Sequence, residues 1–177
     1  MLNNIKEISG ILEVKSSGKG YVVSDILEED IFISKLKLNK AFNGDEVIVY
    51  VYKRRNKLGK IEGEIRRILK RKNKRFIGVL QSNNNFGFVN TRGRRMYTDF
   101  YIEKSQLKKY KNNDKVVVEY IDWPKKSENP NGKIIKSLGK YGNIGTELNG
   151  IINEYEIDEK FNKKVLEELN FLEQTIK

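Results

Sequence analysis

Aromatic and basic side chains gather in one short part of the chain, residues 85–102. Phe86 and Phe88 stand two positions apart, so on a β-strand both rings leave the same face, and Tyr101 follows in a second apolar run. Nucleobases stack on exposed rings of this kind, and the spacing therefore predicts a surface for single-stranded nucleic acid. Gly87 lies between the two phenylalanines and carries no side chain, which we interpret as room for a flat ligand to approach the backbone.

A basic turn separates the two apolar runs and contains Arg92, Arg94 and Arg95. We expect these arginines to neutralise phosphates beside the stacked bases. The alternative is that both phenylalanine rings belong to the core. A half-buried strand usually turns polar residues outward, so an aromatic outer face favours a ligand-binding surface over that alternative.

Charge is distributed unevenly along the 177 residues. The chain has 35 basic and 24 acidic side chains and a net charge of +11, but residues 141–177 hold eight acids against four lysines. The first 140 residues therefore carry +15, which predicts a polyanionic partner for that part of the chain. A generally lysine-rich surface would give the same count and stays an alternative.

The chain contains no cysteine and no histidine. Zinc knuckles, thiol nucleophiles, serine–histidine triads and imidazole bases are thereby excluded. Glu28, Glu29 and Asp30 form the densest group of carboxylates, but no second group accompanies them, so we expect a solvated loop and no metal site. No apolar run is long enough to span a membrane and no signal peptide is evident, which predicts a cytoplasmic protein without a membrane partner.

Five short β-rich runs open the chain, at residues 9–14, 21–23, 30–33, 47–52 and 59–65. Their landmarks return in the same order with an offset of 67 to 73 residues, which indicates an internal duplication. Five short strands with polar turns suit an OB-type barrel, so the predicted fold class is all-β, with one barrel in residues 1–70 and a second in residues 71–140. The matching stretches are 10–12 with 78–80, 20–23 with 87–89, 30–33 with 99–102, 43–47 with 112–116, and 59–61 with 132–134.

The duplication predicts two ring platforms of unequal quality. Tyr21 and Phe32 in the first copy match two of the three rings of the second copy, whereas Lys19 stands in place of Phe86. We expect the second copy to stack bases better. The first copy should contribute more through charge, with Lys19 contacting phosphate.

Two further segments lie outside the strands. Residues 66–75 hold seven basic side chains and no acid, which fits either a solvated linker between barrels or a phosphate contact. Residues 141–177 show helical spacing, with Thr146 as a candidate cap for a first helix and a second apolar stripe from Phe161 to Ile176. We expect this helical linker to pack on something other than a barrel.

The two repeats resemble cold-shock domains. Asn85–Val89 matches the first RNA-binding motif of that family, and Asp99–Ile102 matches the second. A narrower resemblance, to bacterial ribonuclease R in the ribonuclease II family of exoribonucleases, rests on stretches in the first repeat and in the tail. These are residues 18–23, 30–33, 43–45, 145–155 and 161–169.

The resemblance implies a region that captures single-stranded RNA and guides it toward a catalytic domain. In this family that domain follows the linker and uses a cluster of aspartates to hold Mg²⁺ for 3′-to-5′ hydrolysis. The present chain has no such cluster, so we expect no cleavage, no catalytic residues and no cofactor in it. Alternatives are a free-standing RNA chaperone and a protein-interaction module, and single-stranded DNA stays an alternative ligand because stacking does not read the sugar.

Overall fold

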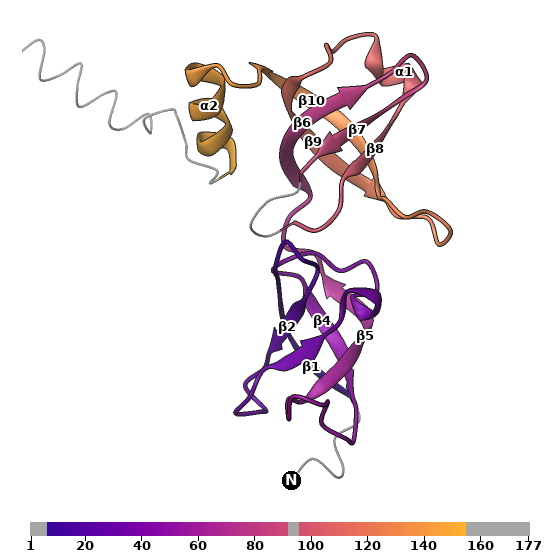
Figure 1. Ribbon diagram of the computed structural model, residues 1–177, viewed down its shortest axis with the longest axis vertical. Coiled ribbons are helices and arrows are strands. Elements are labelled where there is room, and N and C mark those ends of the chain that lie inside the picture. The colour runs from indigo at the N-terminus through magenta and orange to yellow at the C-terminus, as the bar shows by residue number, and fades with distance from the viewer. Residues whose placement is uncertain (1–6, 92–95, 155–177) are drawn as a thin grey trace, which may run out of the picture.

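A computed structural model describes residues 7–91 and 96–154 of the chain. Strands of the first half close into one five-stranded barrel and strands of the second half into another (Figure 1). The first barrel contains β1 (Glu7–Val14), β2 (Gly20–Val23), β3 (Ile31–Ile33), β4 (Glu46–Val51) and β5 (Glu62–Lys70). The second contains β6 (Arg75–Ser82), β7 (Phe86–Asn90), β8 (Phe100–Glu103), β9 (Asp114–Asp122) and β10 (Asn131–Lys140).

Both barrels follow the same circuit of strands. The first runs β1-β2-β3-β5-β4 and returns to β1, and the second runs β6-β7-β8-β10-β9 and returns to β6. The third and fifth strands of each barrel pair in parallel, and all other pairs are antiparallel. A short helix lies between the third and fourth strands in each case, η2 (Lys35–Lys37) or α1 (Lys104–Leu107). The predicted all-β class with two OB-type barrels is confirmed.

Alternating apolar residues fill each barrel. In β4, Val47, Val49 and Val51 point inward and are almost fully buried, while Ile48 and Tyr50 between them lie on the outer face. Period-two alternation of this kind is what allows a short strand to bury one face and expose the other.

The turn before the fourth strand repeats closely in the two barrels. Asn43 in the first and Asn112 in the second each accept a 2.9 Å hydrogen bond from a backbone N–H near the end of the first strand. The next residues, Gly44 and Asn113, both adopt positive φ angles, of 84° and 70°. The two halves therefore repeat one structure down to single hydrogen bonds.

One landmark of the predicted duplication was wrong. Gly59 lies in an exposed loop, and the residue that corresponds to Gly132 of β10 is Gly63 of β5. A Cβ on Gly63 would come within 2.8 Å of the Val49 side chain, and one on Gly132 within 2.5 Å of the Val118 side chain. The exposed loop carries the same Gly-Lys-Ile letters ahead of the strand, but Gly59 answers to a turn with a φ of 73°, whereas Gly63 and Gly132 answer to packing inside a barrel.

The two barrels meet at an aromatic cluster, which we call the barrel junction. Phe42 of the first barrel is 1% exposed and contacts four rings of the second barrel. The ring centroids lie 5.1 to 6.0 Å apart, and the partners are Phe76, Phe100, Tyr120 and Trp123. Hydrogen bonds close the edge of the cluster, since the Tyr97 hydroxyl donates to the Ala41 carbonyl and Lys40 donates to the carbonyls of residues 123 and 124.

A buried ion pair completes the barrel junction. Arg71 lies 3.0 Å from the Asp45 carboxylate, and its guanidinium also stacks on Phe42 at 4.2 Å and on Tyr120 at 4.5 Å. Asp45 is fully buried, and burial raises the pKa of its carboxyl, against the opposing effects of Arg71 and two backbone N–H groups. The interpretation of residues 66–75 as a solvated linker is therefore wrong for Arg71, and residues 66–70 belong to β5.

A helix, α2 (Ile144–Glu154), follows the second barrel. It begins two residues before the predicted cap, because Asn143 accepts the hydrogen bond from the Gly145 N–H at 3.0 Å, while Thr146 is buried. Contrary to the expectation, α2 does contact a barrel: Lys115 of β9 donates to Glu147 at 2.6 Å. The second predicted helix, from Phe161 to Ile176, lies outside the described residues.

Replacing Phe42 with alanine tests the barrel junction. Removal of a fully buried phenylalanine ring should cost about 3–5 kcal/mol of stability in urea denaturation. Phe86→Ala is the matched control, since the same change at a ring that is 39% exposed should cost much less. Equal costs for the two variants would contradict the packing described for Phe42.

The Lys115–Glu147 pair should make the attachment of α2 sensitive to acid. The hydrogen bond from Lys115 lowers the pKa of the Glu147 carboxyl, and the Gly142 N–H lowers it further. A lowered pKa contributes stability above the ordinary value of 4.5, and this contribution is lost as the pH falls through the lowered value. The melting temperature of the wild type should therefore exceed that of Glu147→Gln at pH 7, and the difference should shrink as the pH falls below 4.5. A difference that does not change with pH would contradict this assignment.

Candidate nucleic-acid interface

Three aromatic side chains share the outer face of β7 and β8, and we call them the ring face. Phe88 lies opposite Tyr101 across the two strands, with ring centroids 5.9 Å apart. Phe86 lies 5.7 Å from Phe88 and 6.3 Å from Tyr101, almost parallel to the latter at 28°. Phe86 is 39% exposed and the other two rings are half-buried. The predicted face therefore exists, and the alternative that these rings form the core is wrong.

The opposite face of the same strands is apolar and fully buried. Val89 and Ile102 have no exposed surface, nor does Phe100. Gly87 also points inward, where a Cβ would lie 3.0 Å from the Leu107 side chain. The interpretation of this glycine as an opening for a ligand was wrong, because the residue is required by packing inside the barrel.

Polar groups border the ring face. Gln81 lies opposite Phe88 on β6, Asn131 pairs with Tyr101 from β10, and Glu103 lies opposite Phe86. The Asn83 side chain accepts hydrogen bonds from the backbone of residues 85 and 86, which fixes the start of β7. Amide side chains beside exposed rings can hydrogen-bond the edges of stacked bases. Gln81 and Asn131 were not predicted, because only the strand register brings them to this face.

The first barrel has a smaller platform. Tyr21 and Phe32 face each other across β2 and β3 with centroids 5.7 Å apart. Lys19 is exposed at the turn before β2, as predicted. The Lys60 ammonium, which sequence reasoning missed, lies 5.3 Å from the centre of the Tyr21 ring. A third ring is absent from this face, and a cation covers one of the two that are present.

Positive charge is divided unevenly between the two copies. Residues 7–70 contain thirteen basic and ten acidic side chains, whereas residues 71–140 contain seventeen basic and six acidic ones. The second copy therefore has both the larger ring platform and the larger positive charge. Arg92, Arg94 and Arg95 contribute to that count but lie outside the described residues.

Several carboxylates of the described residues form ion pairs. Glu29 pairs with Arg55 at 2.8 Å, and Glu64 pairs with both Lys37 and Arg66. Within residues 7–91 and 96–154, no group of three or more acids is arranged to hold a metal ion. None of the helices in those same ranges is long and apolar enough to cross a membrane.

Comparison with known proteins matches both halves of the chain. The ribonuclease B OB domain family matches residues 10–68, and the cold shock domain family matches residues 88–162. Ribonuclease R of Thermotoga maritima is 29% identical over 164 residues, and that of Acidithiobacillus ferrooxidans is 23% identical over 171 residues. These alignments cover 91% and 96% of the chain. Over most of its length the chain is therefore similar to a cold-shock and OB-domain region of ribonuclease R.

The relatives are much longer than the matched region. The chain spans 23% of the Thermotoga ribonuclease R and 39% of the Acidithiobacillus one. Among solved structures, Mycoplasma genitalium RNase R matches 92% of the chain with a TM-score of 0.69 at 15% identity, both in its apo form and in complex with ribose-methylated single-stranded RNA. Yeast Ssd1, described as a pseudonuclease, matches 83% of the chain with a TM-score of 0.68 at 20% identity. The present chain therefore shares its fold with part of each of these structures.

Alanine at two glycines tests why the first strands of the second barrel need them. Gly87→Ala should cost about 1 kcal/mol, because the crowding side-chain atoms can move by a few tenths of an ångström. Gly78→Ala should cost more, since its Cβ would lie 2.4 Å from the backbone carbonyl of Asn90. Urea denaturation measures both. If Gly87→Ala instead weakened RNA binding without loss of stability, the packing explanation would be wrong.

Proposed function

We propose that this chain binds single-stranded RNA with little sequence preference, mainly through the ring face of the second barrel. The observation that carries the proposal is the cluster of Phe86, Phe88 and Tyr101 on an outer strand face. Exposed rings in a row provide stacking surfaces that every base can use, because all bases have a π-face. Tyr21 and Phe32 act as a weaker second platform.

Positive charge supplies the remaining affinity. The ring face lies on the copy with the larger excess of basic residues. The cations we assign to phosphates are Lys19 beside the first platform and Arg92, Arg94 and Arg95, which lie in sequence between β7 and β8. Counterion release from RNA should then make binding fall steeply with salt.

The comparisons support an RNA ligand and suggest a wider role. Relatives that carry this region are ribonucleases R, and one of similar fold was solved with single-stranded RNA. We infer that the chain captures a single strand and guides it to the catalytic domain of a cytoplasmic exoribonuclease, where Mg²⁺ would act. The chain itself would not cut RNA. Single-stranded DNA is a weaker candidate ligand of the same surface.

A second candidate function is protein docking through α2. Ile144, Leu148 and Ile151 are 87%, 57% and 50% exposed on this helix. Exposed apolar residues at helical spacing are typical of a contact surface. Deleting residues 141–177 separates the candidates, because RNA binding should persist without the helix while capture of a protein partner should be lost.

Alanine at Phe88 should weaken RNA binding by about 1–3 kcal/mol, the value of one lost stack. Fluorescence anisotropy with a labelled oligo-A RNA measures the affinity, alongside a duplex RNA and the matching DNA. Tyr141→Ala is the control, since that ring is 51% exposed but lies outside the ring face. Unchanged affinity for Phe88→Ala would reject the ring face as the binding surface.

A further inference from the structure

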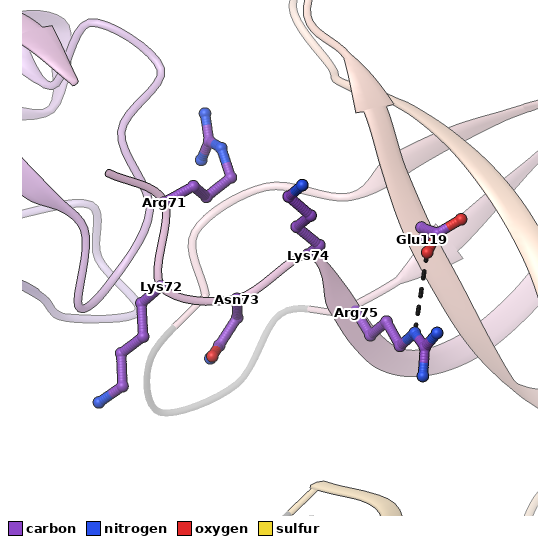
Figure 2. A pocket seen from close by; sticks show the side chains of 6 residues that line it. All are labelled: Arg71, Lys72, Asn73, Lys74, Arg75 and Glu119. Carbon is purple, nitrogen blue, oxygen red and sulfur yellow. Dashed lines mark ion pairs between the residues drawn. The ribbon is translucent and has the colours of Figure 1, made fainter. Parts of the chain in front are cut away.

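The short segment between the barrels forms a positively charged hollow. We call residues 71–75 the junction segment. Figure 2 shows the side chains that line the hollow, which are Arg71, Lys72, Asn73, Lys74, Arg75 and Glu119. Four of the six are cations and one is an acid, and Glu119 lies 3.7 Å from Arg75. No apolar residue lines the hollow, so its chemistry suits an anion and not an apolar side chain.

The backbone of the junction segment is held at both ends. At one end, Arg71 pairs with the buried Asp45, whose second carboxylate oxygen accepts the Lys72 N–H at 3.1 Å. At the other end, the Lys74 carbonyl accepts the Tyr120 N–H at 2.8 Å. A backbone fixed in this way presents its side chains in one arrangement, which reduces the entropy lost on binding.

The two lysines of the junction segment are available to a ligand. Lys72 and Lys74 are exposed, and no described carboxylate lies within ion-pair distance of either. Figure 2 shows their side chains leaving the segment on opposite sides, with Asn73 between them. Lys72 and Lys74 carry like charges two positions apart, whereas Arg71 and Arg75 are paired with acids, and a bound anion would relieve the repulsion between the two lysines.

We propose that the junction segment is a phosphate-binding site for the backbone of single-stranded RNA. The proposal rests on the proposed function and adds a contact that belongs to neither ring platform. Lys72 and Lys74 contact phosphates on either side of the segment, and the Asn73 amide donates a hydrogen bond to the strand between them. Arg71 keeps the segment in place and does not contact RNA.

The salt dependence of binding tests the two lysines. Each phosphate contact on a single strand contributes about 0.7 to the slope of log affinity against log salt concentration. The double variant Lys72→Gln/Lys74→Gln should therefore lose about 1.4 of this slope and on the order of tenfold in affinity at 0.1 M salt. Lys136→Gln/Lys140→Gln is the matched control, because it removes two exposed lysines from β10.

The outcomes separate this proposal from the proposed function. Wild-type binding with an equal loss of slope in both double variants would overturn the junction site and leave the ring face intact. An unchanged slope in Lys72→Gln/Lys74→Gln would do the same. If Phe88→Ala weakens RNA binding without changing the salt slope, and Lys72→Gln/Lys74→Gln reduces that slope, the ring face and the junction site are both supported. Failure of the wild type to bind RNA would overturn both.

A single introduced thiol locates the strand directly. Because the chain has no cysteine, Asn73→Cys creates a unique site for alkylation by the neutral reagent iodoacetamide. Saturating oligo-A RNA should slow this alkylation severalfold and should not affect Lys136→Cys. Equal alkylation of Asn73→Cys with and without RNA, under conditions where anisotropy reports binding, would overturn the junction site.

Discussion

The ion pair between Arg71 and Asp45, together with the Phe42 ring beneath it, is the contact on which the two-barrel arrangement depends. Asp45 is fully buried, and a buried charge is stable only when its hydrogen-bonding capacity is met. Here the guanidinium and the N–H groups of Phe42 and Lys72 meet it. The same carboxylate therefore closes a turn in the first barrel, receives the cation that follows β5 and fixes the path of the chain into the second barrel.

The equivalent turn of the second barrel differs at the docking phenylalanine, so this contact is not repeated there. The equivalent turn in the second barrel also has an aspartate, Asp114, which accepts the N–H of Lys111 as Asp45 accepts that of Phe42. An exposed lysine thus occupies the position of the docking phenylalanine. The chain leaves β10 at this end and enters α2, and the Tyr141 N–H donates to Asn113 of the same turn. One end of each barrel therefore directs the chain onward, in one case to a barrel and in the other to a helix.

Sequence periodicity was sufficient to predict the strands and the ring face, because both depend on side chains that alternate along one strand. The duplication could be predicted from landmarks that recur in the same order. It was insufficient wherever a residue's role depends on a partner distant in sequence. Arg71 is one of seven basic residues among the ten at positions 66–75, and only the folded chain places it beside Asp45, 26 positions earlier. From the sequence, Gly87 could make room either for a ligand or for packing in the core, and only its position next to Leu107 in the fold assigns it to the core. Lys60 was assigned to a strand and instead lies in the loop that covers Tyr21.

The two barrels have therefore diverged toward different tasks. The second carries three rings and most of the positive charge, which are the features that bind a flexible polyanion. The first has two rings, one of them covered by Lys60, and a nearly balanced charge, but it contributes the phenylalanine and the aspartate of the barrel junction. Its β4–β5 loop contacts its own barrel through the Arg55–Glu29 ion pair and Lys60, whereas the corresponding loop of the second barrel contributes Trp123 to the junction. Because the first barrel supplies docking residues of the barrel junction, it fixes the position of the second barrel and therefore of the ring face, on which we propose that the strand stacks.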